Sequence, residues 1–429
     1  MNVSSSVKVR SIEPPRRGEL TSLEALAEKR FSMSADAARA FFEAEVGRLA
    51  TACEQMASRF DQGGRLLVFG TGAAATDAQH VAVEFVHPII AGNQALATIE
   101  LSGNQIAHQI GVLGRPEDIA MGFAGDADRA PVCEALCRAA KGGMMTLSFS
   151  AGANRVGLPA DFAFVAPCDN PMIGQEIHET AYHVLWESVH MFLGHRGSRR
   201  TATVGVPNPC EQLLYPFLSD QPQNSEMGFL LDDVRRSMLW KCQETVDLRR
   251  SMPEHCTAEL IKAARAIAGA FATGRRLWTF GNGGSATDAA DLAHDFLHPP
   301  GGKCSLPAMA LTNDVATLTG VANDVGFENV FVRSLIALAR QGDVAVGITT
   351  SGNSPNIVAG FEAAKRLGLL TVALTGDEGG ECVRLAQSGI VDHLFVVPCQ
   401  HIPRTQEVHA TLYHALWELT HLLLEGGHP

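Results

Sequence analysis

The chain contains the same sequence pattern twice. Residues 70–88 read GTGAAATDAQHVAVEFVHP, and residues 281–299 read GNGGSATDAADLAHDFLHP. A second pair of similar segments follows: QEIHETAYHVLWESVH from Gln175 and QEVHATLYHALWELTH from Gln406. This internal similarity predicts two domains of one fold, and a chain of 429 residues has the length for two. Positions at which the two repeats differ can therefore be compared to infer which functional residues each repeat has kept.

Both repeats alternate short apolar runs with segments of helical periodicity. In the first repeat the runs RLLVFG, ALATIEL, IAMGFA, MMTLSFS and FAFVAP are apolar throughout rather than at every second position. Such strands are typical of a parallel sheet that helices cover on both faces. The sequence therefore predicts an α/β fold with two tandem domains, each a doubly wound parallel sheet flanked by helices.

Composition predicts the domain boundaries. Serine and Pro-Pro content indicates a flexible tail at residues 1–18, and a stretch rich in polar residues and helix breakers indicates a linker at residues 196–225. The two domains are thus expected at residues 19–195 and 226–429. The offset between the repeats grows from 211 residues at the first similar segment to 231 at the second. We expect the first repeat to lack a loop and most of a helix where the second reads NDVGFENVFVRSLIALA.

Charge and composition exclude some partners. A formal net charge of −12 argues against a nucleic-acid partner. No stretch approaches the about 20 apolar residues of a membrane helix, so no membrane partner is expected. The N-terminus has no apolar run of signal-peptide length, and the ten cysteines form no CxxC pair. We expect reduced thiols and a cytoplasmic location.

Two loops of the second repeat have the composition of a phosphate site. GNGGS at 281–285 and TTSGNSPN at 349–356 each lie between an apolar run and a helical segment. Glycines permit close backbone approach, and a helix N-terminus offers free amides and the positive end of the dipole. A single loop of this kind could equally well be an ordinary strand-to-helix turn in which a serine caps the helix. Two of them at the carboxyl ends of parallel strands favour a ligand site.

The first repeat departs from both loops. Ala74 replaces Ser285, and the segment AGDADR brings Asp126 and Asp128 to the positions of Ser351 and Asn353. Carboxylates at these positions would repel a phosphate. The first repeat is therefore expected to bind phosphate poorly.

Histidines and carboxylates recur at helical spacing in the first repeat. His80 and Glu84 are four residues apart, and Gln175 and His183 are eight apart, so each pair lies on one helix face. The four side chains could surround zinc or a similar ion, or place a base and an acid about a carbonyl group. In the second repeat the first pair is Asp291 and Asp295, while Gln406 and His414 keep the second.

The motifs GNGGS, TTSGNS, NDVGF and RTQEVH together resemble the sugar isomerase (SIS) domain and, within it, the phosphoheptose isomerases. The resemblance covers nearly all of residues 226–425 and, more weakly, residues 60–195. It implies a five-stranded parallel sheet, assembly of four domains and, in some members, zinc. It also implies interconversion of sedoheptulose 7-phosphate and D-glycero-D-manno-heptose 7-phosphate.

Matching the family's motifs assigns roles to single residues. The resemblance implies phosphate binding by Ser285, Thr350, Ser351 and Ser354, and sugar contacts by Asn282 and Asp324. The family's helical His and Glu fall on Asp291 and Asp295 in the second repeat, and on His80 and Glu84 in the first. The family's acidic residue before the Arg-x-Gln run is Pro403 here. The second repeat thus keeps the phosphate loops and lacks the His/Glu pair, whereas the first repeat keeps the pair and lacks the loops. An active site composed of residues from both repeats is therefore a further possibility.

The sequence therefore predicts a sugar-phosphate isomerase that moves a proton between adjacent carbons through an enediol. The alternative is a non-catalytic phosphosugar sensor or protein-binding adaptor of the same fold. A dimer of the chain would rebuild the four-domain assembly, with apolar faces supplied by the long helices expected around residues 20–60 and 226–272. Predicted catalytic residues are Glu84, His183, Asp295, Gln406 and His414. Predicted substrate-binding residues are Asn282, Gly283, Gly284, Ser285, Asp324, Thr349, Thr350, Ser351 and Ser354. A divalent metal, zinc by preference, is expected at His80, Glu84, Gln175 and His183.

Overall fold

The computed structural model describes residues 17–88, 93–125, 129–152, 156–201 and 226–426. Residues 1–16 of the tail predicted at 1–18, and residues 202–225 of the linker predicted at 196–225, lie outside this description, as do Asp126 and Asp128. The remaining residues of both predicted segments, 17–18 and 196–201, are helical. The described residues form two compact units. The first-repeat unit comprises residues 36–244, and the second-repeat unit comprises residues 245–426 together with 17–35.

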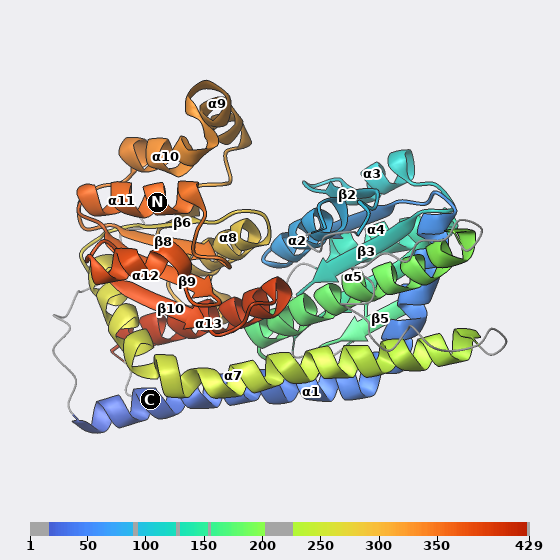
Figure 1. The fold of residues 1–429 in the computed structure, drawn as a ribbon, viewed down its shortest axis with the longest axis horizontal. Coiled ribbons are helices and arrows are strands. Elements are labelled where there is room, and N and C mark those ends of the chain that lie inside the picture. Colours follow the sequence, from blue (N-terminus) through green and yellow to red (C-terminus); the bar gives the residue numbers. More distant parts are fainter. Residues whose placement is uncertain (1–16, 89–92, 126–128, 153–155, 202–225, 427–429) are drawn as a thin grey trace, which may run out of the picture. The chain divides into compact units, whose positions relative to one another are not determined.

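The first-repeat unit is built on a five-stranded parallel sheet with the order β2-β1-β3-β4-β5. Helices α3 and α4 pack on one face against Leu67 and Phe69 of β1, and α2 packs against α5 (Figure 1). The strands are β1 (Leu66–Gly70), β2 (Thr98–Leu101), β3 (Ile119–Ala124), β4 (Met145–Ser150) and β5 (Phe162–Val165). The helices are α2 (Ala74–Val86), α3 (Ile106–Leu113), α4 (Arg129–Lys141) and α5 (Pro171–Thr201).

The second-repeat unit repeats this topology. Its sheet is also five-stranded and parallel, in the order β10-β9-β8-β6-β7. Phe280, Phe331 and Phe361 join the sheet to α10 and α11 in one core. The strands are β6 (Leu277–Phe280), β7 (Ala308–Ala310), β8 (Val344–Thr349), β9 (Leu370–Gly376) and β10 (His393–Val397). The helices are α8 (Gly284–Leu297), η2 (Pro300–Gly302), α9 (Val315–Val325), η3 (Phe327–Asn329), α10 (Val330–Leu338), α11 (Pro355–Arg366), α12 (Gly380–Gln387) and α13 (Ile402–Leu424).

The two sheets confirm the predicted fold class, since each is a doubly wound parallel sheet covered by helices. Buried strands such as β3 and β8 have every residue inaccessible to solvent, which explains why their sequences are apolar throughout. Within the described part of the chain, no helix combines the length and the hydropathy needed to cross a membrane.

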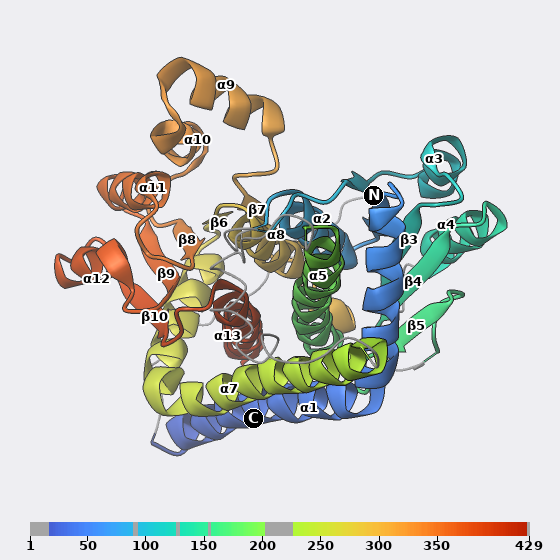
Figure 2. The same ribbon diagram turned by 45° about the vertical axis from the view of Figure 1, so that its right-hand side comes forward.

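The long leading helices are divided between the two units. Of α1 (Arg17–Asp61), residues 17–35 belong to the second-repeat unit; of α7 (Glu226–Ala272), residues 226–244 belong to the first-repeat unit. In each unit, an ion pair at equivalent positions connects the leading helix segment from the other repeat to the closing helix. Arg30 Nε lies 3.4 Å from Glu418 on α13, and Lys241, at the equivalent position of the other repeat, pairs with Glu187 on α5. Figure 2 shows both helices as continuous ribbons. The predicted boundary follows the repeats in the sequence, whereas the compact units follow the packing.

The length difference between the repeats lies earlier than predicted. The first repeat does have a helix, α3, between its second and third strands, and this helix occupies the position of α10. The second repeat adds α9 and η3 before that point. The first repeat does lack a helix and a loop, as expected, but the missing helix is α9, none of whose residues is buried, and not the helix within FVRSLIAL.

A buried charged cluster anchors α13 to α7. Arg404 Nη1 donates to both carboxylate oxygens of Glu407, at 2.6 and 2.9 Å. Arg249 of α7 donates from Nη2 to the backbone oxygen of Glu407 at 3.0 Å, and Thr245 donates to its carboxylate. All four side chains are fully buried, so these contacts replace the water that the charges lose.

Candidate functional site

The sheet topology brings the two predicted phosphate loops together. The connection after β6 leads to β7 on one side, and the connection after β8 leads to β9 on the other. Ligands of open α/β sheets bind at such a switch point, outside the carboxyl ends of the strands. GNGGS follows β6 and TTSGNSPN follows β8, so both loops lie at this point.

Paired amides connect the two loops directly. Asn282 Nδ2 donates to Asn356 Oδ1 at 2.9 Å, and Asn356 Nδ2 donates back to Asn282 Oδ1 at 2.8 Å. The pairing fixes the distance between the start of α8 and the start of α11, whose free amides point out of the helix ends. Asn356 was not among the predicted site residues. Its place one residue after the first position of a helix, in a loop already assigned to phosphate, is the signal that could have identified it.

Glycines set the backbone shape of both loops. Gly283 and Gly352 have φ of 54° and 66°, where side chains are strained. A Cβ on Gly352 would lie 2.1 Å from the backbone oxygen of Gly379. Gly284 is the first residue of α8 and is buried, whereas Gly283 is exposed at the loop surface.

Hydroxyls line both helix starts. Ser285 and Thr349 are buried, Thr350 and Ser354 are partly buried, and Ser351 is exposed. Thr349 Oγ1 lies 3.4 Å from Ser354 Oγ, and Ser351 Oγ accepts a hydrogen bond from the backbone nitrogen of Asn353 at 3.2 Å. The structure therefore places Thr349, Thr350, Ser351 and Ser354 in one turn, with Ser285 on the neighbouring one.

The matching turn of the first repeat lacks these groups. Thr71 replaces Asn282 after β1, and α2 begins at Ala74, the position of Ser285. The first repeat therefore has neither the paired amides nor the serine at the start of this helix. Its other loop, with Asp126 and Asp128, falls outside the described residues.

An acid–base cluster lies further along α8. The Asp291 and Asp295 Oδ2 atoms each lie 3.4 Å from His414 Nε2 on α13, and all three side chains are buried. Tyr413 donates from its hydroxyl to Asp291 Oδ2 at 2.9 Å. Trp417 donates from its indole nitrogen to the backbone oxygen of Asp295, which holds the last turns of α8 against α13. Three ligand atoms within 4.8 Å suit either a proton relay or a cation.

Burial determines the proton chemistry of this cluster. Loss of hydration, and then the charge of Asp291, raise the pKa of Asp295 to about 7, against the opposing effect of His414. A carboxyl group that titrates near neutrality can act as a base or as an acid. The predicted catalytic residue Gln406 lies on the same helix as His414, and its buried Oε1 has no hydrogen-bond partner.

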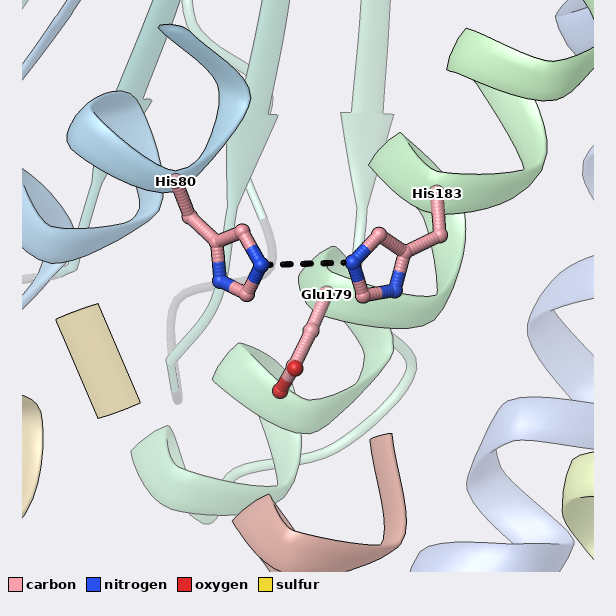
Figure 3. Close-up of side chains that lie close together, drawn as sticks. All are labelled: His80, Glu179 and His183. Atoms are coloured by element: carbon pink, nitrogen blue, oxygen red, sulfur yellow. Dashed lines mark hydrogen bonds between the residues drawn. The ribbon is translucent and has the colours of Figure 1, made fainter. Parts of the chain in front are cut away.

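The first repeat has the nitrogen-rich counterpart of this cluster. His80 Nε2 on α2 lies 3.3 Å from His183 Nε2 on α5 (Figure 3). Glu84 Oε1 lies 3.8 Å from His80 Nε2. Burial, and then the proximity of His183, lower the pKa of His80 well below its usual value. Burial raises the pKa of Glu84, whose Oε2 is buried without a hydrogen-bond partner. Two imidazoles beside a carboxylate oxygen that lacks a donor fit a bound cation.

Glu179 joins this group, although the sequence analysis did not select it. A carboxylate oxygen of Glu179 and the nitrogens of His80 and His183 all lie within 4.8 Å of one another. Glu179 is one helical turn before His183, the same spacing as His80 and Glu84, and this spacing could have identified it. Gln175, predicted as a ligand, donates from Nε2 to Thr76 Oγ1 at 3.1 Å.

Two other family positions occupy distinct environments. Asp324 lies exposed on α9 and accepts a hydrogen bond from Asn323, so its sugar contact stays a prediction. Pro403, at the position of the family's acidic residue, is buried in the first turn of α13.

Comparison with known proteins places the chain in a family. The SIS domain model matches residues 242–376. The chain is 40% identical over 204 residues to the phosphoheptose isomerase of Nitratidesulfovibrio vulgaris strain Miyazaki F, across 46% of this chain and 93% of that protein. It is 40% identical over 178 residues to the phosphoheptose isomerase of Aquifex aeolicus, across 41% of this chain and 91% of that protein.

One solved structure resembles the fold over nearly the whole chain. The C-terminal domain of glucosamine-fructose-6-phosphate aminotransferase from Francisella tularensis superposes with a TM-score of 0.62. The match covers 92% of this chain and 95% of that domain at 8% identity, so it supports the tandem fold alone. The two phosphoheptose isomerases described above, each covered over more than nine tenths of its length, show that the chain belongs to the phosphoheptose isomerase family of SIS-domain proteins.

Proposed function

We propose that this sugar-phosphate isomerase interconverts sedoheptulose 7-phosphate and D-glycero-D-manno-heptose 7-phosphate, and that the second repeat performs the chemistry. One observation carries the proposal: α8 begins in the phosphate loop and carries Asp291 and Asp295 two to three turns later. At about 1.5 Å per residue, Asp291 lies about 9 Å along the helix from Ser285. A sugar chain of several carbons can span such a distance between its phosphate and its carbonyl end.

The phosphate would bind at the paired helix starts. The amides of α8 and α11 would face its oxygens, and the hydroxyls of Ser285, Thr350, Ser351 and Ser354 would donate to them. The Asn282–Asn356 pair would set the width of the site. Asn282 and Asp324 are the proposed sugar contacts, as the family resemblance implies.

The isomerisation would proceed by one proton moved between adjacent carbons. Asp295 would remove the proton from the carbon next to the carbonyl group, giving an enediol. His414 would carry the proton between the two oxygens, and Asp295 would return its own proton to the other carbon. Gln406 would accept a hydrogen bond from a sugar hydroxyl with its unpartnered oxygen. Zinc, where the family binds it, would polarise a carbonyl group.

The test is turnover of sedoheptulose 7-phosphate by the full chain, with the metal content of the same sample measured. Asp295→Asn and His414→Ala are expected to lower kcat by at least about a hundredfold. Glu84→Gln and His183→Ala are the matched variants at the equivalent positions of the first repeat, and they should leave much of the turnover. The reverse ranking would assign the chemistry to the first repeat.

The alternative function is phosphosugar sensing without turnover. It is favoured by one observation: the family's helical His and Glu are Asp291 and Asp295 in the repeat that keeps the phosphate loops. A protein that binds sedoheptulose 7-phosphate but never converts it, with or without added zinc, would be a sensor.

We also propose that the chain is a cytoplasmic homodimer, which would bring four SIS domains together. Family resemblance supports the number of domains. The leading helix α7 supports the interface, because it exposes 65% of Phe229 and 62% of Trp240 to solvent.

A further inference from the structure

We infer that Tyr413 is a positioning residue of the second repeat: its hydroxyl holds the carboxylate of Asp291 beside His414 and leaves Asp295 to exchange the substrate proton. The proposed function gives roles to His414 and Asp295 but none to Asp291 or Tyr413. The role of Tyr413 rests on that proposed function and deepens it, because it explains how two carboxylates beside one imidazole can act differently.

The hydrogen bonds of α13 distinguish the two aspartates of α8. Tyr413 donates from its hydroxyl to Asp291 Oδ2 at 2.9 Å, and this oxygen lies 3.4 Å from His414 Nε2. Trp417 donates at 2.9 Å to the backbone oxygen of Asp295 rather than to its carboxylate. Asp295 Oδ2 also lies 3.4 Å from His414 Nε2. The tyrosine therefore fixes the direction of one carboxylate, whereas the other keeps its side chain for the reaction.

Burial makes a fixed carboxylate valuable to the imidazole. Tyr413, Asp291 and His414 are each at most 2% exposed, so bulk water does not surround the ring. A carboxylate in such a place interacts with an imidazole more strongly than it would in water. In the proposed reaction His414 is protonated while it carries the proton between two sugar oxygens. A carboxylate held at the ring stabilises that charge and keeps the ring in one orientation.

The first repeat carries the same tyrosine without the aspartate. Tyr182 occupies the position of Tyr413, and His80 occupies the position of Asp291. The ring of Tyr182 packs against the ring of His80, with centroids 5.1 Å apart. The tyrosine is thus common to both repeats, whereas the carboxylate that accepts its hydrogen bond belongs to the second repeat. Tyr182 is therefore the matched control for Tyr413.

The competing explanation is that Asp291 only satisfies a buried phenol. A buried tyrosine hydroxyl usually has a hydrogen-bond partner, and removal of such a bond lowers stability. A bond of this kind would affect unfolding and not the rate of the reaction. The two explanations therefore give different results for Tyr413→Phe, which removes the hydroxyl and keeps the ring.

The first experiment measures turnover of sedoheptulose 7-phosphate by the intact chain. Tyr413→Phe should lower kcat by about 10- to 100-fold and change KM by less than about twofold, because the phosphate loops are unaltered. Tyr182→Phe should leave both constants at their wild-type values. A wild-type kcat in Tyr413→Phe, accompanied only by a lower Tm, would overturn the positioning role and support the purely structural bond.

The second experiment tests whether the hydroxyl acts through Asp291. Asp291→Ala removes the acceptor, so Tyr413→Phe should cause little further loss of kcat in that background. A full further loss would show that the hydroxyl acts elsewhere and would overturn the inference. Asp291→Leu, which resembles aspartate in shape and also lacks an acceptor, covers the case in which the alanine variant does not fold. Circular dichroism checks the folding of every variant.

The third experiment gives a result even without turnover. In the chain labelled with nitrogen-15 histidine, the Nε2 signal of His414 is identified by its loss in His414→Gln. Tyr413→Phe should move this signal, Tyr182→Phe should not, and Asp291→Ala should abolish the response to Tyr413→Phe. A wild-type chain that does not convert the sugar would contradict the proposed function. A His414 signal that Tyr413→Phe leaves in place would overturn the positioning role, with or without turnover.

Discussion

Tyr413 donates a hydrogen bond of 2.9 Å to Asp291, one of the two carboxylates that flank His414. Burial, and then the charge of Asp291, raise the pKa of the neighbouring Asp295 to about 7.

Activity should depend on the protonation of Asp295. As a base it must lose its proton, so kcat/KM should rise with pH and level off above about pH 7. Asp295→Asn should abolish this limb of the profile together with most of the turnover. Asp324→Asn, a change on the exposed helix α9, should leave the shape of the profile unaltered. A profile that is flat from pH 5 to about pH 9 would contradict the assignment.

The free energy of unfolding should fall as pH rises, because the folded state binds a proton at Asp295. The folded pKa of Asp295 lies above the ordinary 3.8, so the folded state holds a proton that the unfolded state releases. Its contribution is complete below about pH 4 and is lost as pH rises towards about 7. Urea unfolding at pH 5 and at pH 8 should show a larger loss for wild type than for Asp295→Asn. Equal losses would count against the raised pKa.

Phosphate affinity should depend on the second repeat's loops. Ser351→Ala removes one hydroxyl donor to a charged ligand and should weaken binding by about 1–2 kcal/mol, which is roughly tenfold in Kd. Ser388→Ala, at the far end of α12, is the matched control and should have no effect. Isothermal titration with sedoheptulose 7-phosphate measures both. Unchanged affinity in Ser351→Ala would show that Ser351 does not contact the phosphate, and the proposed phosphate site would be wrong.

The buried pair on α13 should matter to folding far more than its exposed counterpart. Arg404→Met leaves the carboxylate of Glu407 buried without its bidentate partner and should cost about 3–5 kcal/mol of unfolding free energy. Arg384→Met breaks an exposed pair with Glu381 and should cause no measurable change. Denaturant unfolding of both variants is the measurement. Similar effects of the two substitutions would refute the role of burial.

The proposed dimer gives a mass prediction. Light scattering should report about twice the 45.7 kDa of one chain. Trp240→Glu on α7 should lower the mass to that of one chain, whereas Val112→Glu, equally exposed on α3, should not. A wild-type mass of one chain at micromolar concentration would exclude the dimer.

Local pattern was enough to predict the sheets and to place two glycine- and hydroxyl-rich loops at the ends of their strands; phosphate binding by these loops stays a prediction. Apolar runs such as RLLVFG and RLWTFG, recurring between helical segments, predict buried parallel strands. The structure shows both as interior strands of their sheets. Asn356 and Glu179 required knowledge of which loop and which helix face lie opposite, and only the three-dimensional fold supplies that. The spacing of Glu179 and His183 was present in the sequence, but a carboxylate four residues from a histidine is common on helices. Sequence also gave no sign that residues 17–35 pack with the second repeat, because a long amphipathic helix does not specify its partner.

The exchange of leading helix segments has a consequence for how the chain is made. Residues 17–35 are synthesised before either repeat, yet the unit they complete includes α13, which ends at Leu424. Their side chains Leu23, Ala27 and Phe31 stay uncovered until the second repeat has been synthesised. The first-repeat unit in turn needs residues 226–244. Cutting the gene between the repeats would therefore yield two fragments that each lack a helix segment, and only their coexpression would restore both.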